Sequence, residues 1–151
     1  MQNLPIPLAE AWDFFSSPAN LSKITPAKMN FIIKSNFSPD TKMYPGMMIS
    51  YKVSPVFGIK MNWTTEITHV KDHVYFVDEQ RTGPYAIWHH EHHFKEIKGG
   101  VEMTDILTYA IPFGIIGQIA NAVLVEKEVQ KIFEYRTGQV DKLFGVYKER
   151  V

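Results

Sequence analysis

Alternating apolar and polar positions are the main pattern between Met29 and Ala110. A period of two residues is typical of β-strands that bury one face. Six segments alternate in this way or are rich in strand-forming residues: 29–36, 47–54, 60–70, 73–82, 85–97 and 100–110. Turn-forming pairs such as Lys71-Asp72 and Gly99-Gly100 separate them. Because these separators are short, we expect the strands to form an antiparallel meander.

Helical patterns flank this region. Residues 8–16 are good helix formers, and Ser17-Pro18 ends that helix and starts a second short one to about Ile24. After Pro112 the apolar run FGIIGQIANAVLV begins a region with helical periodicity, which predicts one long C-terminal helix. Its expected inward stripe contains Val125, Val129, Ile132, Arg136, Val140, Leu143 and Tyr147. The sequence therefore predicts two short helices, a six-stranded meander and a long helix, an α+β arrangement.

Composition narrows the class of protein. The 151 residues fit one domain covering 1–151, and the equal numbers of basic and acidic residues, 16 each, argue against nucleic-acid binding. The absence of cysteine excludes disulfides and thiolate metal sites. The N-terminus lacks the pattern of a signal peptide, and no apolar run is long enough to span a membrane. We expect a cytoplasmic protein that does not insert into membranes.

The segment WHHEHHF, from Trp88 to Phe94, is the densest group of titratable residues. On a strand, His90 and His92 share one face, and His89, Glu91 and His93 share the other. With Lys98-Gly99 as a two-residue hairpin loop, Phe94 lies opposite Met103, His92 opposite Asp105, His90 opposite Leu107, and Trp88 opposite Tyr109. This register makes one face mostly apolar, so we predict that His90 and His92 point inward.

The same counting from Lys71-Asp72 places Ile67 opposite Phe76, Thr65 opposite Asp78, and Trp63 opposite Gln80. If both hairpins face one cavity, the candidate ligand-binding residues are Trp63, Ile67, Phe76, Asp78, Gln80, Trp88, His90, His92, Phe94, Met103, Asp105, Leu107 and Tyr109, with Arg136 from the long helix. For Arg136 we favour a buried stem with its charge in solvent, and an inward pairing with Asp78, Asp105 or a ligand carboxylate is the alternative.

Three stretches carry a family resemblance: IPLAEAWDFFSSPANLSKITP, FVDEQRTGPYAIWHHEHHF, and GGVEMTDILTYAIPFG with the later IFEYR. Together they resemble the SRPBCC superfamily, the helix-grip group of START domains, birch-pollen-allergen-like proteins and polyketide cyclases. The resemblance implies a curved antiparallel sheet of six to seven strands gripping the long helix, with a deep apolar cavity between them. It does not name a ligand. Members usually begin with a full strand, whereas here only about Gln2 to Pro7 is available.

Three functions follow as hypotheses. The first is binding of a small hydrophobic or amphipathic molecule in the cavity. The second is a cyclase or dehydratase in which His92 paired with Asp105 acts as acid and base. The third is a protein-interaction domain whose cavity is filled by side chains. His90 and His92 could supply two metal ligands, but no motif fixes a third nitrogen, so we expect neither metal nor cofactor. We expect a monomer or weak homodimer.

Overall fold

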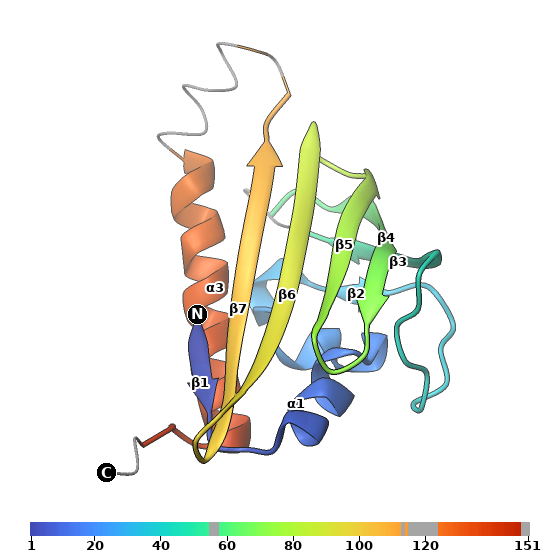
Figure 1. The fold of residues 1–151 in the computed structure, drawn as a ribbon. Helices are drawn as coiled ribbons and strands as arrows, with labels where there is room; N and C mark the ends of the chain where they lie inside the picture. The colour runs from blue at the N-terminus through green and yellow to red at the C-terminus, as the bar shows by residue number, and fades with distance from the viewer. Residues whose placement is uncertain (55–57, 113, 115–123, 149–151) are drawn as a thin grey trace.

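A seven-stranded antiparallel sheet forms most of the computed structural model, which describes residues 1–54, 58–112, 114 and 124–148 (Figure 1). The elements are β1 (Gln2–Leu4), α1 (Leu8–Phe15), η1 (Pro18–Lys23), η2 (Ala27–Met29), β2 (Ile32–Ile33), β3 (Met47–Val53), β4 (Met61–Lys71), β5 (Tyr75–Thr82), β6 (Ile87–Ile97), β7 (Gly100–Ala110) and α3 (Glu126–Phe144). The strand order is β1-β7-β6-β5-β4-β3-β2. This is the α+β helix-grip fold that the sequence predicted.

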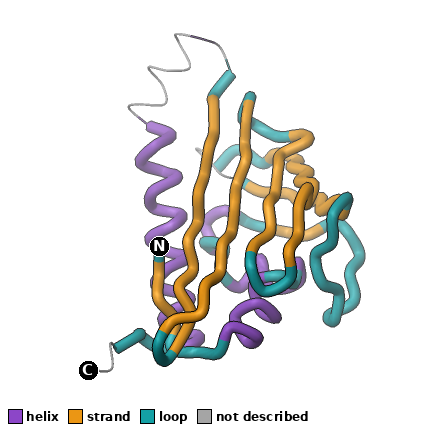
Figure 2. Tube along the Cα trace, in the orientation of Figure 1, coloured by secondary structure: helices purple, strands orange, loops and turns teal. Residues whose placement is uncertain are grey.

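The N-terminal strand is short but lies next to the long helix. It pairs with β7, with Gln2 opposite Met103 and Leu4 opposite Val101. Figure 2 shows α3 beside this strand, and the Gln2 side chain donates hydrogen bonds to the Thr137 carbonyl (3.1 Å) and to Asp141 Oδ1 (2.8 Å). The meander therefore gains a seventh strand at one edge, and this strand connects the sheet to α3.

Two N-terminal segments differ from the prediction. The predicted second short helix is present as the 3₁₀ helix η1, whereas a further 3₁₀ helix, η2, was not predicted. The strand expected over 29–36 is reduced to β2, because η2 occupies its start and Asn30 has a left-handed backbone with φ 48°. The prediction of a full strand there was wrong.

The β6/β7 hairpin has the predicted register, with His92 opposite Asp105 and Ile97 opposite Gly100. The β4/β5 register was wrong, because Ile67 lies opposite Asp78 and Thr65 opposite Gln80. The loop contains three residues, 72–74, rather than two, and a register shift between Ile67 and His69 interrupts the ladder. A bulge of this kind adds one residue to β4 and so changes which residues pair. Ile67 and Asp78 become partners and both lie on the inner face of the sheet.

Helix α3 buries Val129 and Val140 as expected. Leu143, however, is 48% exposed, so its inward assignment was wrong. Phe144, four residues after Val140, occupies the inward position and packs edge-on against Phe14 with ring centroids 5.0 Å apart. An α-helix of 3.6 residues per turn moves Leu143 off the face that Val140 and Phe144 share. The apolar run at 115–123, predicted to begin this helix, lies outside the described residues.

The apolar core lies between α1, α3 and the inner face of the sheet. Trp12 and Phe15 on α1 are buried against Phe94 on β6, with ring centroids 5.5 and 5.7 Å away. A second cluster surrounds Trp63 and Tyr85 near the other end of the sheet. Among the described helices, none is both long and apolar enough to cross a membrane.

Candidate functional site

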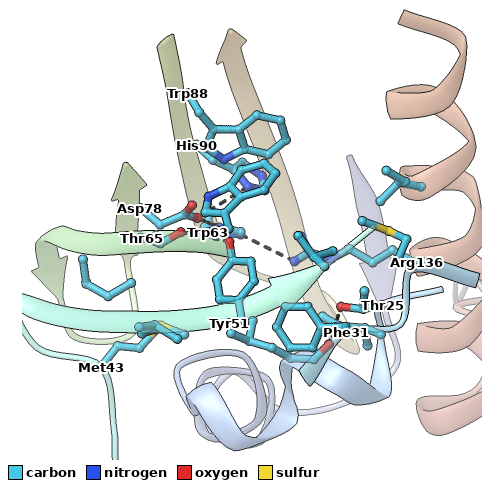
Figure 3. A pocket seen from close by; sticks show the side chains of 18 of the residues that line it. Thr25, Phe31, Met43, Tyr51, Trp63, Thr65, Asp78, Trp88, His90 and Arg136 are labelled. Carbon is cyan, nitrogen blue, oxygen red and sulfur yellow. Dashed lines mark hydrogen bonds and ion pairs between the residues drawn. The ribbon is translucent and has the colours of Figure 1, made fainter. Parts of the chain in front are cut away.

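A cavity of about 170 Å³ lies among the sheet, the η1–η2 segment and α3 (Figure 3). Aromatic and aliphatic side chains form most of its wall, including Trp63, Phe76 and Trp88 from the strands. Ile132, Phe133 and Arg136 reach it from α3. The wall is therefore largely apolar, with polar groups concentrated on β5 and β6.

The candidate residues divide into two groups. Those on the cavity wall are Trp63, Ile67, Phe76, Asp78, Trp88, His90, His92 and Arg136. Those off the wall are Gln80, Phe94, Met103, Asp105, Leu107 and Tyr109. Direct contact with a ligand stays a prediction for the first group. The second group does not line the cavity, and its packing explains why.

Packing and hydrogen bonds explain the second group. Phe94 and Met103 belong to the core cluster beneath α1. Gln80 is held by the backbone of Tyr85, donating to its carbonyl at 2.7 Å and accepting from its N–H at 3.2 Å. Tyr109 and the half-buried Leu107 lie toward the far end of β7, where the Tyr109 ring packs against Tyr85. Expecting these residues on the wall followed from extending one apolar face over the whole sheet, whereas the cavity occupies only part of it.

His90 and His92 point inward, as predicted. They are 6% and 5% exposed, and their ring centroids are 3.8 Å apart. His89, Glu91 and His93 lie on the opposite face, where His93 Nε2 is 2.8 Å from Glu91 Oε2. The alternation of the strand thus separates the four histidines into an inner and an outer pair.

The inner pair belongs to a buried polar cluster, defined as Asp78, His90, His92, Asp105 and Arg136. His92 Nε2 is 2.7 Å from Asp78 Oδ2, and His92 Nδ1 is 2.9 Å from Asp105 Oδ1. His90 Nε2 lies 3.1 Å from the same Asp105 oxygen. Arg136 Nη1 approaches this oxygen to 3.2 Å. Asp105 therefore lies behind the histidines, and Asp78 is the carboxylate of the cluster that reaches the cavity wall.

Arg136 points inward. Its side chain is 12% exposed and pairs with Asp105, so the preferred expectation of a solvent-directed charge was wrong and the alternative was right. Two carboxylates buried on β5 and β7 require a positive partner, and Arg136 is placed to provide it. A stripe on one helix cannot reveal this requirement.

The carboxylates of the cluster are ionised. Burial raises the pKa of Asp105, but the charge of Arg136 and hydrogen bonds from both histidines outweigh burial and hold this pKa well below its usual range. Burial likewise opposes ionisation of Asp78, and the hydrogen bond from His92 with the nearby positive charges lowers its pKa overall. The cluster therefore contains two negative charges.

The histidines differ in protonation. Burial lowers the pKa of His92, but its contacts with Asp105 and Asp78 outweigh burial and raise this pKa above its ordinary value of 6.5. Burial and the neighbouring His92 lower the pKa of His90. Both ring nitrogens of His92 face carboxylate oxygens, at 2.7 and 2.9 Å, so both act as donors and this ring is the one that carries the additional proton. With Arg136⁺ and His92⁺ against Asp78⁻ and Asp105⁻, the buried polar cluster has no net charge.

This arrangement restricts the chemistry of His92. Both of its ring nitrogens already face carboxylates, so neither is directed toward a substrate. Asp78, His90 and His92 present possible metal-binding atoms within 4.8 Å of one another. A divalent cation there would have to replace the His92 proton and lie near Arg136, in a cluster that is already neutral.

Sequence reasoning missed part of the wall. Tyr51 and Thr65 line the cavity, and their hydroxyl oxygens are 2.9 Å apart. The alternation of Met47, Ile49, Tyr51 and Val53 along β3 could have identified Tyr51 as inward. Phe31, between η2 and β2, has no comparable signal, because an irregular segment has no fixed period.

The chain resembles several solved structures. Protein Ms6760 from Mycobacterium smegmatis is 20% identical with a TM-score of 0.67, over 93% of this chain and 85% of that one. Protein CV1439 from Chromobacterium violaceum is 10% identical with a TM-score of 0.69, over 97% and 94%. Ara h 8.0201 is 14% identical with a TM-score of 0.57, over 93% and 94%. No protein-family model and no curated protein matches the chain. At these identities the likeness shows a shared helix-grip fold.

Proposed function

We propose that this protein is a ligand-binding member of the SRPBCC superfamily that holds one small, mainly apolar molecule in the cavity. The observation that carries the proposal is the cavity itself, with a volume of about 170 Å³. An apolar cavity of about 150 Å³ in another protein accommodates benzene. The space here therefore suits a ligand of about one ring, and larger molecules require side chains to move.

The composition of the wall supports binding. Apolar side chains such as Phe76 and Ile67 supply contact area, and Asp78 and the histidines lie on one side of the space. Ligand sites typically combine an apolar lining with a few placed polar groups that orient the ligand. An amphipathic ligand would direct its polar end toward β5 and β6.

The geometry of the cluster favours binding over the acid–base hypothesis. A general base needs a nitrogen or oxygen within hydrogen-bond reach of the substrate. His92 has both nitrogens occupied and Asp105 lies off the wall, so this pair is better suited to stabilising and orienting Asp78. An open cavity also weighs against the hypothesis of an interaction domain whose interior is filled.

Native mass spectrometry of the protein purified from its own host tests the proposal, with a denatured extract to identify what is released. We expect one organic molecule per chain, lost on denaturation. Ile132→Trp provides the control, because a larger side chain at this wall position fills the cavity. Equal retention of the molecule by this variant would place the ligand elsewhere. A protein that carries no organic molecule and takes up no ring-sized probe would contradict the proposal.

A further inference from the structure

We infer that the ligand is uncharged and presents a hydrogen-bond-accepting oxygen, such as a ketone carbonyl, to the wall formed by Trp63, Tyr51 and Arg136. This inference rests on the proposed function and adds the chemistry of the ligand's polar end. Unused hydrogen-bond donors around the cavity carry it.

Two buried N–H groups on the wall have no acceptor. Trp63 is 4% exposed, and its Nε1 has no hydrogen-bond partner among the described residues. Arg136 directs Nη1 to Asp105, but its buried Nε has no partner within the same part of the chain. A buried donor without an acceptor is costly and uncommon. Both side chains line the cavity, so a ligand that fills it and repositions them is the available source of the missing acceptor.

A hydroxyl pair adds to these donors. Tyr51 and Thr65 both line the cavity, with their oxygens 2.9 Å apart. Their mutual hydrogen bond uses one of the two hydroxyl protons, which leaves the other for a further acceptor. Burial is the main cause that raises the pKa of Tyr51 above its ordinary value of 10.0, so its proton stays in place. Tyr51 and Trp63 are neighbours, with ring centroids 5.9 Å apart, and Figure 3 shows both, with Asp78, among the residues that line the pocket.

The charge balance of the buried polar cluster favours an uncharged ligand. Asp78 faces the cavity and lies in a cluster whose two carboxylates are already balanced by Arg136 and His92. A ligand carboxylate would add an uncompensated negative charge near Asp78. An ammonium group would add a positive charge near Arg136. Either charge would lose its water without gaining an unpaired partner.

Three ring-sized probes test the inference on the full chain: toluene, acetophenone and benzoate. The change in tryptophan fluorescence reports binding, because Trp63 and Trp88 line the cavity. We expect acetophenone to bind at least about tenfold more tightly than toluene at neutral pH, as one additional satisfied hydrogen bond allows. Benzoate should bind more weakly than acetophenone.

Three variants, one of them a control, locate the effect. Trp63→Phe removes the orphan donor, so the preference for acetophenone over toluene should fall about tenfold. Ile67→Val is the control, since it changes the same wall without removing any N–H or O–H group, and the preference should persist. Tyr51→Phe, which removes a hydroxyl donor, provides a second test should Trp63→Phe not fold. The fold of each variant is checked by circular dichroism.

The outcomes separate the two proposals. Three results would overturn the inference of an uncharged, accepting ligand while leaving the cavity a binding site. The first is equal affinity for toluene and acetophenone, and the second is tightest binding of benzoate. The third is a preference for acetophenone over toluene that is unchanged in both Trp63→Phe and Tyr51→Phe. If neither toluene nor acetophenone binds, the proposed function itself is wrong, and the inference is lost with it.

Discussion

Arg136 on the C-terminal helix and Asp105 on β7 form a buried ion pair, with 3.2 Å between Nη1 and Oδ1. Their side chains are 12% and 13% exposed, so water screens the pair only weakly. The pair joins α3 to the inner face of the sheet and supplies one of the two positive charges that balance the cluster. The five side chains of the buried polar cluster therefore both stabilise the fold and form the polar part of the candidate site.

Arg136→Met should therefore destabilise the protein strongly. Removing one partner leaves Asp105 as an uncompensated buried charge, which typically lowers the free energy of unfolding by about 3–5 kcal/mol. Urea unfolding at neutral pH measures the loss. Lys131→Met, which removes an exposed ion pair with Glu128 on the same helix, is the control and should unfold like the wild type. Equal stability of the two variants would show that the Arg136 charge is not needed in the interior.

The contribution of His92 to stability should depend on pH. Its pKa is raised in the folded protein, so its stabilising effect is complete below the unfolded-state value of about 6.5 and is lost as pH rises through the folded-state pKa. His92→Asn should thus be most destabilising, relative to wild type, near about pH 5.5, with a deficit that shrinks toward about pH 9. Urea unfolding across this range tests the trend, and a deficit that grows with pH would contradict the protonated ring.

His90 should show the opposite trend. Its pKa is lowered in the folded protein, so its contribution is complete above about pH 6.5 and is lost as pH falls, when the unfolded chain takes up a proton that the folded chain does not. The deficit of His90→Asn should therefore be largest above neutral pH and smaller near about pH 5.5. If the loss of unfolding free energy changed with pH in the same way in both histidine variants, the two rings would titrate alike, contrary to this prediction.

The sequence predicts the direction of a side chain in this site where local contacts determine it, and fails where contacts distant in the sequence do. The inward direction of His90 and His92 follows from two local features, the alternation of a strand and a two-residue loop with Gly99 at φ 77°. The β4/β5 pairing could not be counted in the same way, because a bulge near Thr68 changes the register without a sequence signal. Asp78 still faces inward, since the bulge preserves the face.

The direction of Arg136 depends on partners that are distant in the sequence. Periodicity places it on the inner stripe of α3, but a long cationic side chain there can turn outward or inward. Inward is favoured only because β5 and β7 bring Asp78 and Asp105 beneath the helix. The extent of the cavity is equally non-local, since it depends on where η1 and η2 cover the sheet, and these irregular segments have no period to read.

Gly100 should tolerate no larger residue. A Cβ at this position would overlap the backbone carbonyl oxygen of Leu4, which cannot move without disturbing the pairing of β1 with β7. Gly100→Ala should lower the free energy of unfolding by about 1–3 kcal/mol. Gly138→Ala on α3 is the matched control, because no atom lies within 4 Å of its added Cβ and alanine stabilises a helix by about 0.5–1 kcal/mol. The midpoint of thermal unfolding should fall in Gly100→Ala and rise in Gly138→Ala. An unchanged midpoint in Gly100→Ala would show that β1 is not packed against this position.

Filling the cavity from the helix side should weaken ligand binding without unfolding the protein. Ile132 lies on the cavity wall and is half-buried, so Ile132→Trp can extend a larger side chain into the existing space with little strain on the backbone. Toluene affinity should fall at least about tenfold, because the ring of the ligand and the new indole compete for the same volume. Tyr135→Trp, at a position on α3 that is 37% exposed, is the control and should bind toluene like the wild type. Undiminished affinity in a folded Ile132→Trp variant would place the binding site outside this cavity, since a space of about 170 Å³ cannot hold an indole and a toluene ring together.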